Sequence, residues 1–152
     1  MRFVAFAVCC VVFTLTAASV NSSPGFDRRC TPNIQVRLVK AVVAAFNAGH
    51  VATLDRLVAR KPAFQWWSDT AANRLYRAAE TRSTFRAYAR RRHRVHDHLT
   101  LVDFGTTNEQ GRIRLNLDLR RRADDYHSTD IIHAKQEAVC PPGRARIIVW
   151  SM

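Results

Sequence analysis

The chain has 152 residues, 47% apolar and 24% charged, which suits one folded domain of ordinary size and excludes a disordered chain. Five glycines and five prolines exclude a collagen-like or low-complexity protein. The 24 lysines and arginines outnumber the 12 acidic residues and give a formal net charge of +12, which favours an anionic partner.

The first residues have the layout of a secretory signal peptide. A short basic start precedes an uncharged apolar run over residues 3–20, which closes on the small residues Ala17-Ala18-Ser19. We therefore expect residues 1–19 to be a signal peptide, residues 20–31 a linker and residues 32–152 one domain of a secreted protein. The alternative is an uncleaved N-terminal membrane anchor, because about 18 apolar residues can just span a bilayer.

The cysteines fit export. Cys9 and Cys10 would leave with the signal peptide, so that the mature chain keeps Cys30 and Cys140. Two cysteines in an exported chain are expected to form one disulfide. The disulfide would join the start of the first helix to the end of a late strand, and in the chain-entropy model it stabilises by about 4–5 kcal/mol. Two buried free thiols are the alternative.

Helices are predicted in the first half of the domain. Thr31 is the expected N-cap of a helix that begins at Pro32 and stops at the stretch ending in Gly49. A short second helix is predicted from Val51 to Pro62. A third helix is predicted around the Phe85, Tyr88 and Ala89 stripe, continuing through the arginine-rich stretch as far as Leu99.

The other elements are predicted to be strands. They cover residues 64–68, 99–104, 112–120, 132–140 and 145–150. A turn over 106–111 and a loop over 121–130 separate the middle ones. Because helices come early and strands late, the chain predicts an α+β domain in which one face of an antiparallel sheet packs on the helices. The other sheet face would meet water or a partner, including a second copy in a homodimer.

Strand alternation assigns side chains to faces. Gln136 falls on the inner face, where its amide needs a backbone group or a polar ligand as its partner. His133 and Asp118 fall on the outer face, so an exposed cross-strand charge ladder is favoured over a catalytic dyad.

Residues 42–69, VVAAFNAGHVATLDRLVARKPAFQWWSD, resemble the nuclear transport factor 2-like superfamily, including its SnoaL-like branch. The AFNAG phrase that closes a helix carries the resemblance, together with the short helix and apolar strand that follow. The element order over residues 32–152 is also similar. The resemblance implies a cone-shaped α+β barrel, in which a curved antiparallel sheet wraps three N-terminal helices and leaves an apolar pocket. Members of the superfamily include isomerases, dehydratases, cyclases, epoxide hydrolases and non-catalytic binding proteins, so fold does not settle function.

The ketosteroid isomerase branch of that superfamily can be compared position by position. Counted from the AFNAG phrase, its phenolic hydrogen-bond donor falls on Val42 and its general-base carboxylate on Trp66, or on Trp67 after a one-residue slip. Valine donates no hydrogen bond and indole is no base. These positions therefore do not carry isomerase chemistry.

The candidate ligand-binding residues are Trp66, Trp67, Tyr88 and Gln136, which could line an apolar pocket with a few polar tips. The alternative is that the aromatic residues belong to an ordinary core. We expect a non-catalytic binding module for a small apolar molecule or for a partner. A SnoaL-like isomerase or dehydratase that uses Tyr88 or Gln136 is the catalytic alternative.

The basic residues suggest a third function. The basic run comprises Arg86, Arg90, Arg91, Arg92 and Arg94 on the third helix and Arg120, Arg121 and Arg122 in the following loop. Among them Arg86, Arg90, Arg91 and Arg94 are the candidate anion-binding residues for a membrane or an anionic surface polymer. A solvated charged face is the alternative. Export and the lack of a recognition motif disfavour nucleic acid.

A metal site is not expected. His93, His96 and His98 are closely spaced, but no further ligand is apparent and the neighbouring arginines repel cations. The sequence contains no phosphate-binding glycine loop and no nucleophile elbow. We therefore predict no cofactor and assign no catalytic residue.

Overall fold

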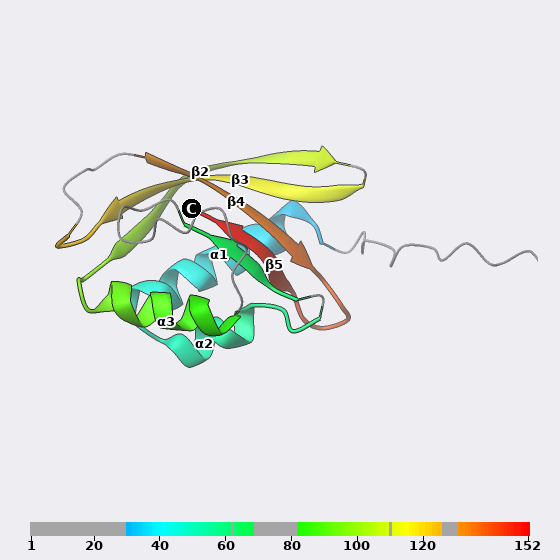
Figure 1. Cartoon of the computed structure of the whole chain (residues 1–152). Helices are drawn as coiled ribbons and strands as arrows, with labels where there is room; N and C mark the ends of the chain where they lie inside the picture. The colour runs from blue at the N-terminus through cyan, green and yellow to red at the C-terminus, as the bar shows by residue number, and fades with distance from the viewer. Residues whose placement is uncertain (1–29, 62, 69–81, 110, 126–130) are drawn as a thin grey trace, which may run out of the picture.

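The computed structural model describes residues 30–61, 63–68, 82–109, 111–125 and 131–152 (Figure 1). The predicted signal peptide, and the linker as far as residue 29, lie outside these ranges. Within the ranges, no helix is long and apolar enough to span a membrane.

Three helices form one layer: α1 (Pro32–Asn47), α2 (Val51–Leu57) and α3 (Arg82–His93). The start of α1 is as predicted, because the Thr31 hydroxyl accepts a hydrogen bond from the Ile34 amide at 3.4 Å. Its end is also as predicted, since Gly49 turns the chain at a φ of 66°. The sequence therefore encodes both ends of α1 locally.

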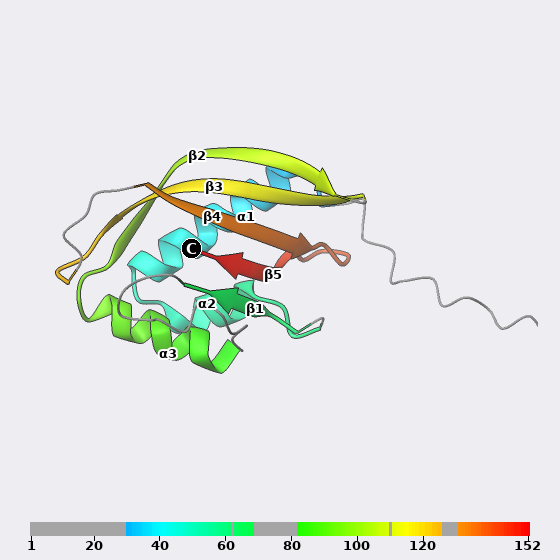
Figure 2. The same cartoon turned by 45° about the horizontal axis from the view of Figure 1, so that its top comes forward.

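The second layer is a sheet of five strands, β1 (Gln65–Trp67), β2 (His98–Glu109), β3 (Arg112–Arg122), β4 (Ile131–Val139) and β5 (Arg146–Ser151). Their order across the sheet is β1-β5-β4-β3-β2, and the helices cover one face of it (Figures 1 and 2). This open α+β arrangement confirms the predicted fold class.

One feature of the predicted sheet is wrong: it is mixed, because β1 pairs with β5 in parallel. The other three neighbouring pairs are antiparallel. The long connection through α3 and three further strands permits a parallel pair, which a tight hairpin does not. The short β1 thus lies beside the last strand of the domain.

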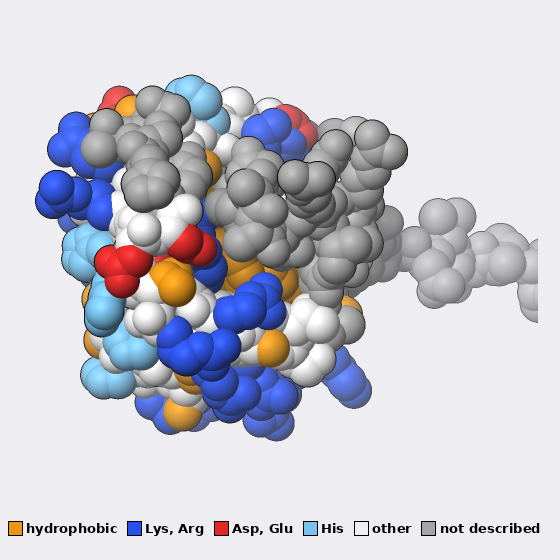
Figure 3. Space-filling view, turned by 60° about the vertical axis from the view of Figure 1, so that its left-hand side comes forward, with side chains coloured by type: hydrophobic (Ala, Val, Ile, Leu, Met, Phe, Trp, Pro, Cys, Tyr) orange, Lys and Arg blue, Asp and Glu red, His pale blue; other side chains and the backbone are white. Residues whose placement is uncertain are grey.

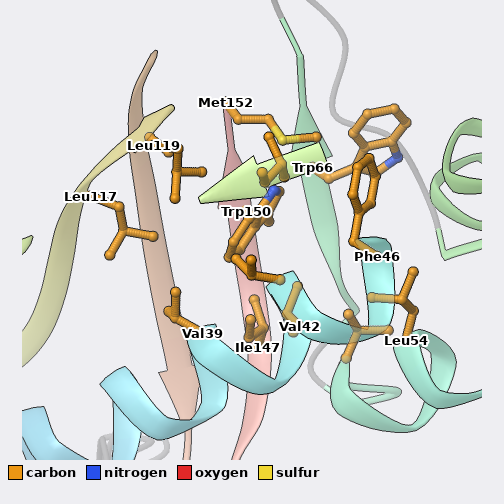
Figure 4. Packing of buried hydrophobic residues seen from close by; sticks show 14 of the residues in the cluster. Val39, Val42, Phe46, Leu54, Trp66, Leu117, Leu119, Ile147, Trp150 and Met152 are labelled. Carbon is orange, nitrogen blue, oxygen red and sulfur yellow. The ribbon is translucent and has the colours of Figure 1, made fainter. Parts of the chain in front are cut away.

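The core lies between the layers. Leu117 and Leu119 of β3 face Val39 and Val42 of α1, and Trp150 lies between the β3 leucines and Trp66 (Figure 4). The predicted disulfide is confirmed: Cys30 and Cys140 are bonded, with their Cα atoms 5.3 Å apart. It joins Cys30, two residues before α1 begins, to the residue after β4.

Four predicted boundaries are wrong. Helix α2 ends at Leu57 instead of reaching Pro62, because the chain is already extended at Val58. Helix α3 ends at His93 instead of Leu99, because the chain turns at His96 with a φ of 51° and the Asp97 amide donates to the Arg92 carbonyl at 3.0 Å. The predicted turn over 106–111 is mostly strand, since β2 stays paired with β3 as far as Glu109. The predicted loop over 121–130 begins too early, because β3 continues through Arg122.

Strand β2 forms one edge of the sheet. Val102 and Phe104 on it are 48% and 44% exposed, so this edge carries large apolar side chains in contact with solvent. The predicted homodimer through the sheet stays a prediction.

Candidate functional site

One row of inward-facing side chains crosses four neighbouring strands of the sheet, from β3 to β1. Cross-strand register places Leu115 of β3 opposite Gln136 of β4, Gln136 opposite Trp150 of β5, and Trp150 beside Trp66 of β1. Leu115, Gln136, Trp150 and Trp66 are all at most 1% exposed. A single amide therefore stands in an otherwise apolar row.

Gln136 is buried as strand parity predicts, at 0% exposure. Neither its amide oxygen nor its amide nitrogen has a hydrogen-bond partner among the described residues. The indole nitrogen of its cross-strand neighbour Trp150 is also buried without a partner there. Two adjacent residues thus present one acceptor and three N–H donors to the interior.

A second buried amide comes from α1. The Gln35 side-chain nitrogen donates to the carbonyl oxygens of Cys30 at 3.4 Å and Ile113 at 3.1 Å. Its Oε1 is buried and has no partner within the described part of the chain. Because Ile113 lies two residues from Leu115, which opposes Gln136, Gln35 reaches the same part of β3 as the inward row.

The predicted aromatic residues are only partly brought together. The rings of Trp66 and Tyr88 are 4.7 Å apart, and the Trp66 indole donates to the Thr84 hydroxyl at 3.1 Å. Trp67 is half-buried and follows Trp66 on β1, so its side chain points to the opposite face of the sheet. Trp66 and Tyr88 therefore border the interior, whereas Trp67 does not share their face.

A buried ionic cluster lies where α3 meets the ends of β2 and β3. Asp97 is 2% exposed and accepts hydrogen bonds from Arg92 Nε at 2.6 Å and from Arg121 Nε at 3.0 Å. Arg92 also forms a two-pronged pair with Asp125, at 2.7 and 2.8 Å. Arg121 donates to the Tyr88 hydroxyl at 2.9 Å. The cluster ties a helix, two strands and the segment after β3 together.

The pKa values of this cluster follow from its pairing. Burial alone would lower the pKa of Arg92, but hydrogen bonds to Asp125 and Asp97 outweigh it and raise that pKa. The pKa of Arg121 is raised against burial in the same way, by Asp97 and Tyr88. The Arg92 hydrogen bond lowers the pKa of Asp125. The charges of Arg92, Arg121 and Asp125 are therefore fixed near neutral pH, which suits a structural role better than proton transfer.

Sequence patterns do not predict this cluster, because Arg92 and Arg121 belong to the basic run, for which either an anionic partner or solvent is expected. Both are buried instead, at 3% and 0% exposure. The signal was present for Arg121, because the alternation of Leu117 and Leu119 continues onto it and points it inward.

The outer face matches its prediction. His133 and Asp118 lie opposite each other on β4 and β3, with Nδ1 and Oδ1 2.8 Å apart. Their side chains are 81% and 42% exposed. The pair is thus a solvent-facing cross-strand contact.

The candidate anion-binding arginines are dispersed. Arg86 lies 3.7 Å from Asp55, Arg90 and Arg91 are exposed on α3, and Arg94 follows the end of that helix. Helix α3 therefore carries Arg86, Arg90 and Arg91 but not Arg94. Figure 3 shows the face on which Lys and Arg side chains gather over the helical side of the molecule. Among the described residues, no group of His, Cys, Asp and Glu side chains is arranged to hold a metal ion.

Comparison with known proteins identifies the fold. No family model matches the chain, and no curated protein matches it. It is similar to the structure of a proposed dehydratase of the nuclear transport factor 2-like family from Streptomyces avermitilis, at 12% identity and a TM-score of 0.59, over 80% of this chain and 96% of that one. A proposed ketosteroid isomerase from Shewanella frigidimarina gives 13% identity and a TM-score of 0.55, over 76% and 90%. A protein of unknown function from Pseudomonas putida gives 10% and 0.56, over 78% and 82%.

These similarities agree with the resemblance in residues 42–69. At such low identities they establish the fold alone: the chain has the nuclear transport factor 2-like fold. The function has to be argued from the chain's own residues.

Proposed function

We propose that the protein is an exported, non-catalytic binding module that holds a small, mainly apolar molecule between the sheet and the helices. The observation that carries the proposal is the Gln136 amide, fully buried and without a partner among the described residues, beside the similarly placed Trp150 indole. The ligand's polar group would bind these two side chains, and its apolar body would contact the aromatic residues around Trp66 and Tyr88.

Energetics support a ligand at this position. A buried polar group without a partner costs about 1–3 kcal/mol, and here both ends of one amide and an indole N–H are in that state. A leucine in place of Gln136 would fit the inward row without this penalty. A buried amide at such a position is typical of binding sites, where a polar group lowers the stability of the free protein but recognises the ligand.

Binding is favoured over catalysis because the buried ionisable groups are engaged with one another. Both oxygens of Asp97 accept hydrogen bonds from guanidinium groups, and the Tyr88 hydroxyl accepts one from Arg121. A catalytic acid or base needs an oxygen available to the substrate. The SnoaL-like enzyme alternative would require Tyr88 to act, so Tyr88→Phe tests it: loss of a turnover that wild type shows would favour the enzyme.

The experiment is a titration with N-phenyl-1-naphthylamine, a neutral apolar fluorophore with one N–H group, combined with native mass spectrometry of the purified protein against neutral apolar metabolites. Gln136→Leu removes the amide at nearly constant side-chain volume, and Trp150→Phe removes the indole N–H while keeping an aromatic ring. Gln65→Leu is the matched control, because Gln65 is exposed on β1. We expect both interior variants to bind at least about tenfold more weakly, a difference of about 1.4 kcal/mol. Unchanged affinity in both would contradict the proposal.

A further inference from the structure

A basic groove lies away from the interior, between the end of α2 and the turn that joins β4 to β5. Its volume is about 440 Å³. The two segments that form its walls lie side by side in Figures 1 and 2. The cations that line it are Arg56, Arg60, Lys61, Arg144 and Arg146, and Asp55 is the one acidic residue among the described residues of the lining.

The two segments that form the groove are fixed to the rest of the fold. The Ala59 amide donates to the Ile147 carbonyl at 2.8 Å, and Val58 forms a parallel bridge with Ile147, so the segment after α2 is fixed to β5. On the other side, the disulfide at Cys140 anchors the chain just before the turn. Both walls are therefore held in place without a ligand, which lowers the entropic cost of binding.

The lining is amphipathic. Its floor includes the apolar side chains of Val58, Ala59, Val139 and Pro141. Arg60 and Arg144 are exposed and belong to opposite walls. A second pocket of about 540 Å³ shares Arg60 and Asp55 with the groove and adds Arg82 and Arg86, so positive charge continues along the molecule.

The acidic side chain in the groove lining is already paired with arginines of α3. Asp55 forms a 2.5 Å ion pair with Arg82 and lies 3.7 Å from Arg86. None of the five groove cations forms an ion pair with a carboxylate of a described residue. Burial, together with the charge of Arg144, lowers the pKa of Arg146. Because like charges so arranged repel one another, an anionic ligand would relieve the repulsion.

We propose that this groove binds a segment of an anionic polysaccharide, with sulfate or carboxylate groups on the basic walls and the apolar faces of sugar rings on the floor. The shape argues against a membrane, since a flat bilayer does not enter a groove. The lining residues that the structure describes include no aromatic ring on which a nucleic-acid base could stack. A polysaccharide also agrees with the predicted export of the chain.

The test is fluorescence anisotropy with a fluorescein-labelled heparin dodecasaccharide at near-physiological salt. Arg60→Ala/Arg144→Ala removes one exposed cation from each wall. Arg90→Ala/Arg91→Ala removes the same charge from the exposed surface of α3 and is the matched control. We expect the groove variant to bind about tenfold more weakly and the α3 variant less than about twofold, with a shallower salt dependence for the groove variant. Equal losses, or a larger loss in the α3 variant, would overturn the proposal.

Competitors distinguish the sources of negative charge. Unlabelled dodecasaccharide should displace the probe at lower charge concentration than polyglutamate, oligothymidine or phosphatidylglycerol vesicles. Stronger displacement by any of these three would also overturn the proposal. If the groove variant does not fold, Lys61→Ala/Arg144→Ala serves in its place. The groove variant should still bind N-phenyl-1-naphthylamine as wild type does, so this test and that of the interior site succeed or fail independently.

Discussion

The buried carboxylate of Asp97 provides the sharpest stability prediction. Asp97→Ala removes the partner that Arg92 and Arg121 share, and the side chains of these two arginines are only 4% and 0% exposed. Arg92 keeps its pair with Asp125, and Arg121 keeps its hydrogen bond to the Tyr88 hydroxyl, but both lose the carboxylate that they share. Breaking a buried ion pair from one side costs about 3–5 kcal/mol, because a charge is left without compensation. We expect a loss of that size.

The assay is urea unfolding followed by tryptophan fluorescence, with Asp118→Ala as the control. Asp118 also contacts a basic partner, but its side chain is 42% exposed, so its loss should cost at most about 1 kcal/mol. Adding Arg121→Met to Asp97→Ala should restore part of the lost stability, since it removes a buried charge that has lost the Asp97 carboxylate. A loss at Asp97 no larger than that at Asp118 would refute the reasoning.

Three further predictions concern the stability of the domain. Replacing Cys30 and Cys140 by serine should lower the free energy of unfolding by about 4–5 kcal/mol, from the sequence separation of 110, and a loss below about 1 kcal/mol in chemical denaturation would contradict it. The folded-state pKa of Asp125 lies below its unfolded value of 3.8, so its ion pair stabilises the fold above that pH and the contribution disappears as pH falls through the folded pKa. The stability difference between wild type and Asp125→Asn should therefore shrink on acidification. A difference that grows would contradict this prediction. Gly49→Ala should destabilise by about 1–3 kcal/mol in thermal melts, because φ is 66° there and the new Cβ would lie 2.6 Å from the His93 ring; an unchanged melting temperature would argue against this.

Local patterns predicted much of the fold. The cap at Thr31 and the stop at Gly49 set the ends of α1, and strand alternation placed Gln136 inside and His133 outside. These signals succeed because they depend on neighbours in the chain or on the two-residue repeat of a strand. The disulfide followed from a count of two cysteines in the predicted mature chain.

Long-range contacts explain what was missed. Helix α3 ends early so that Asp97 can turn inward between two arginines, and nothing within a helical window signals such a partner. Arg121 looked solvated because it stands in a run of arginines, although the alternation already pointed it inward. The basic groove was not predicted because its walls, around Arg60 and Arg144, meet only in the folded chain.

The central claim is that the buried Gln136 amide belongs to a ligand site, and one paired measurement tests it. The free energy of unfolding and the affinity for N-phenyl-1-naphthylamine are determined for wild type, Gln136→Leu and the Gln65→Leu control. The account predicts that Gln136→Leu gains about 1 kcal/mol or more of stability without ligand and loses about tenfold in affinity. A Gln136→Leu protein that is less stable and binds the fluorophore as tightly as wild type would contradict it.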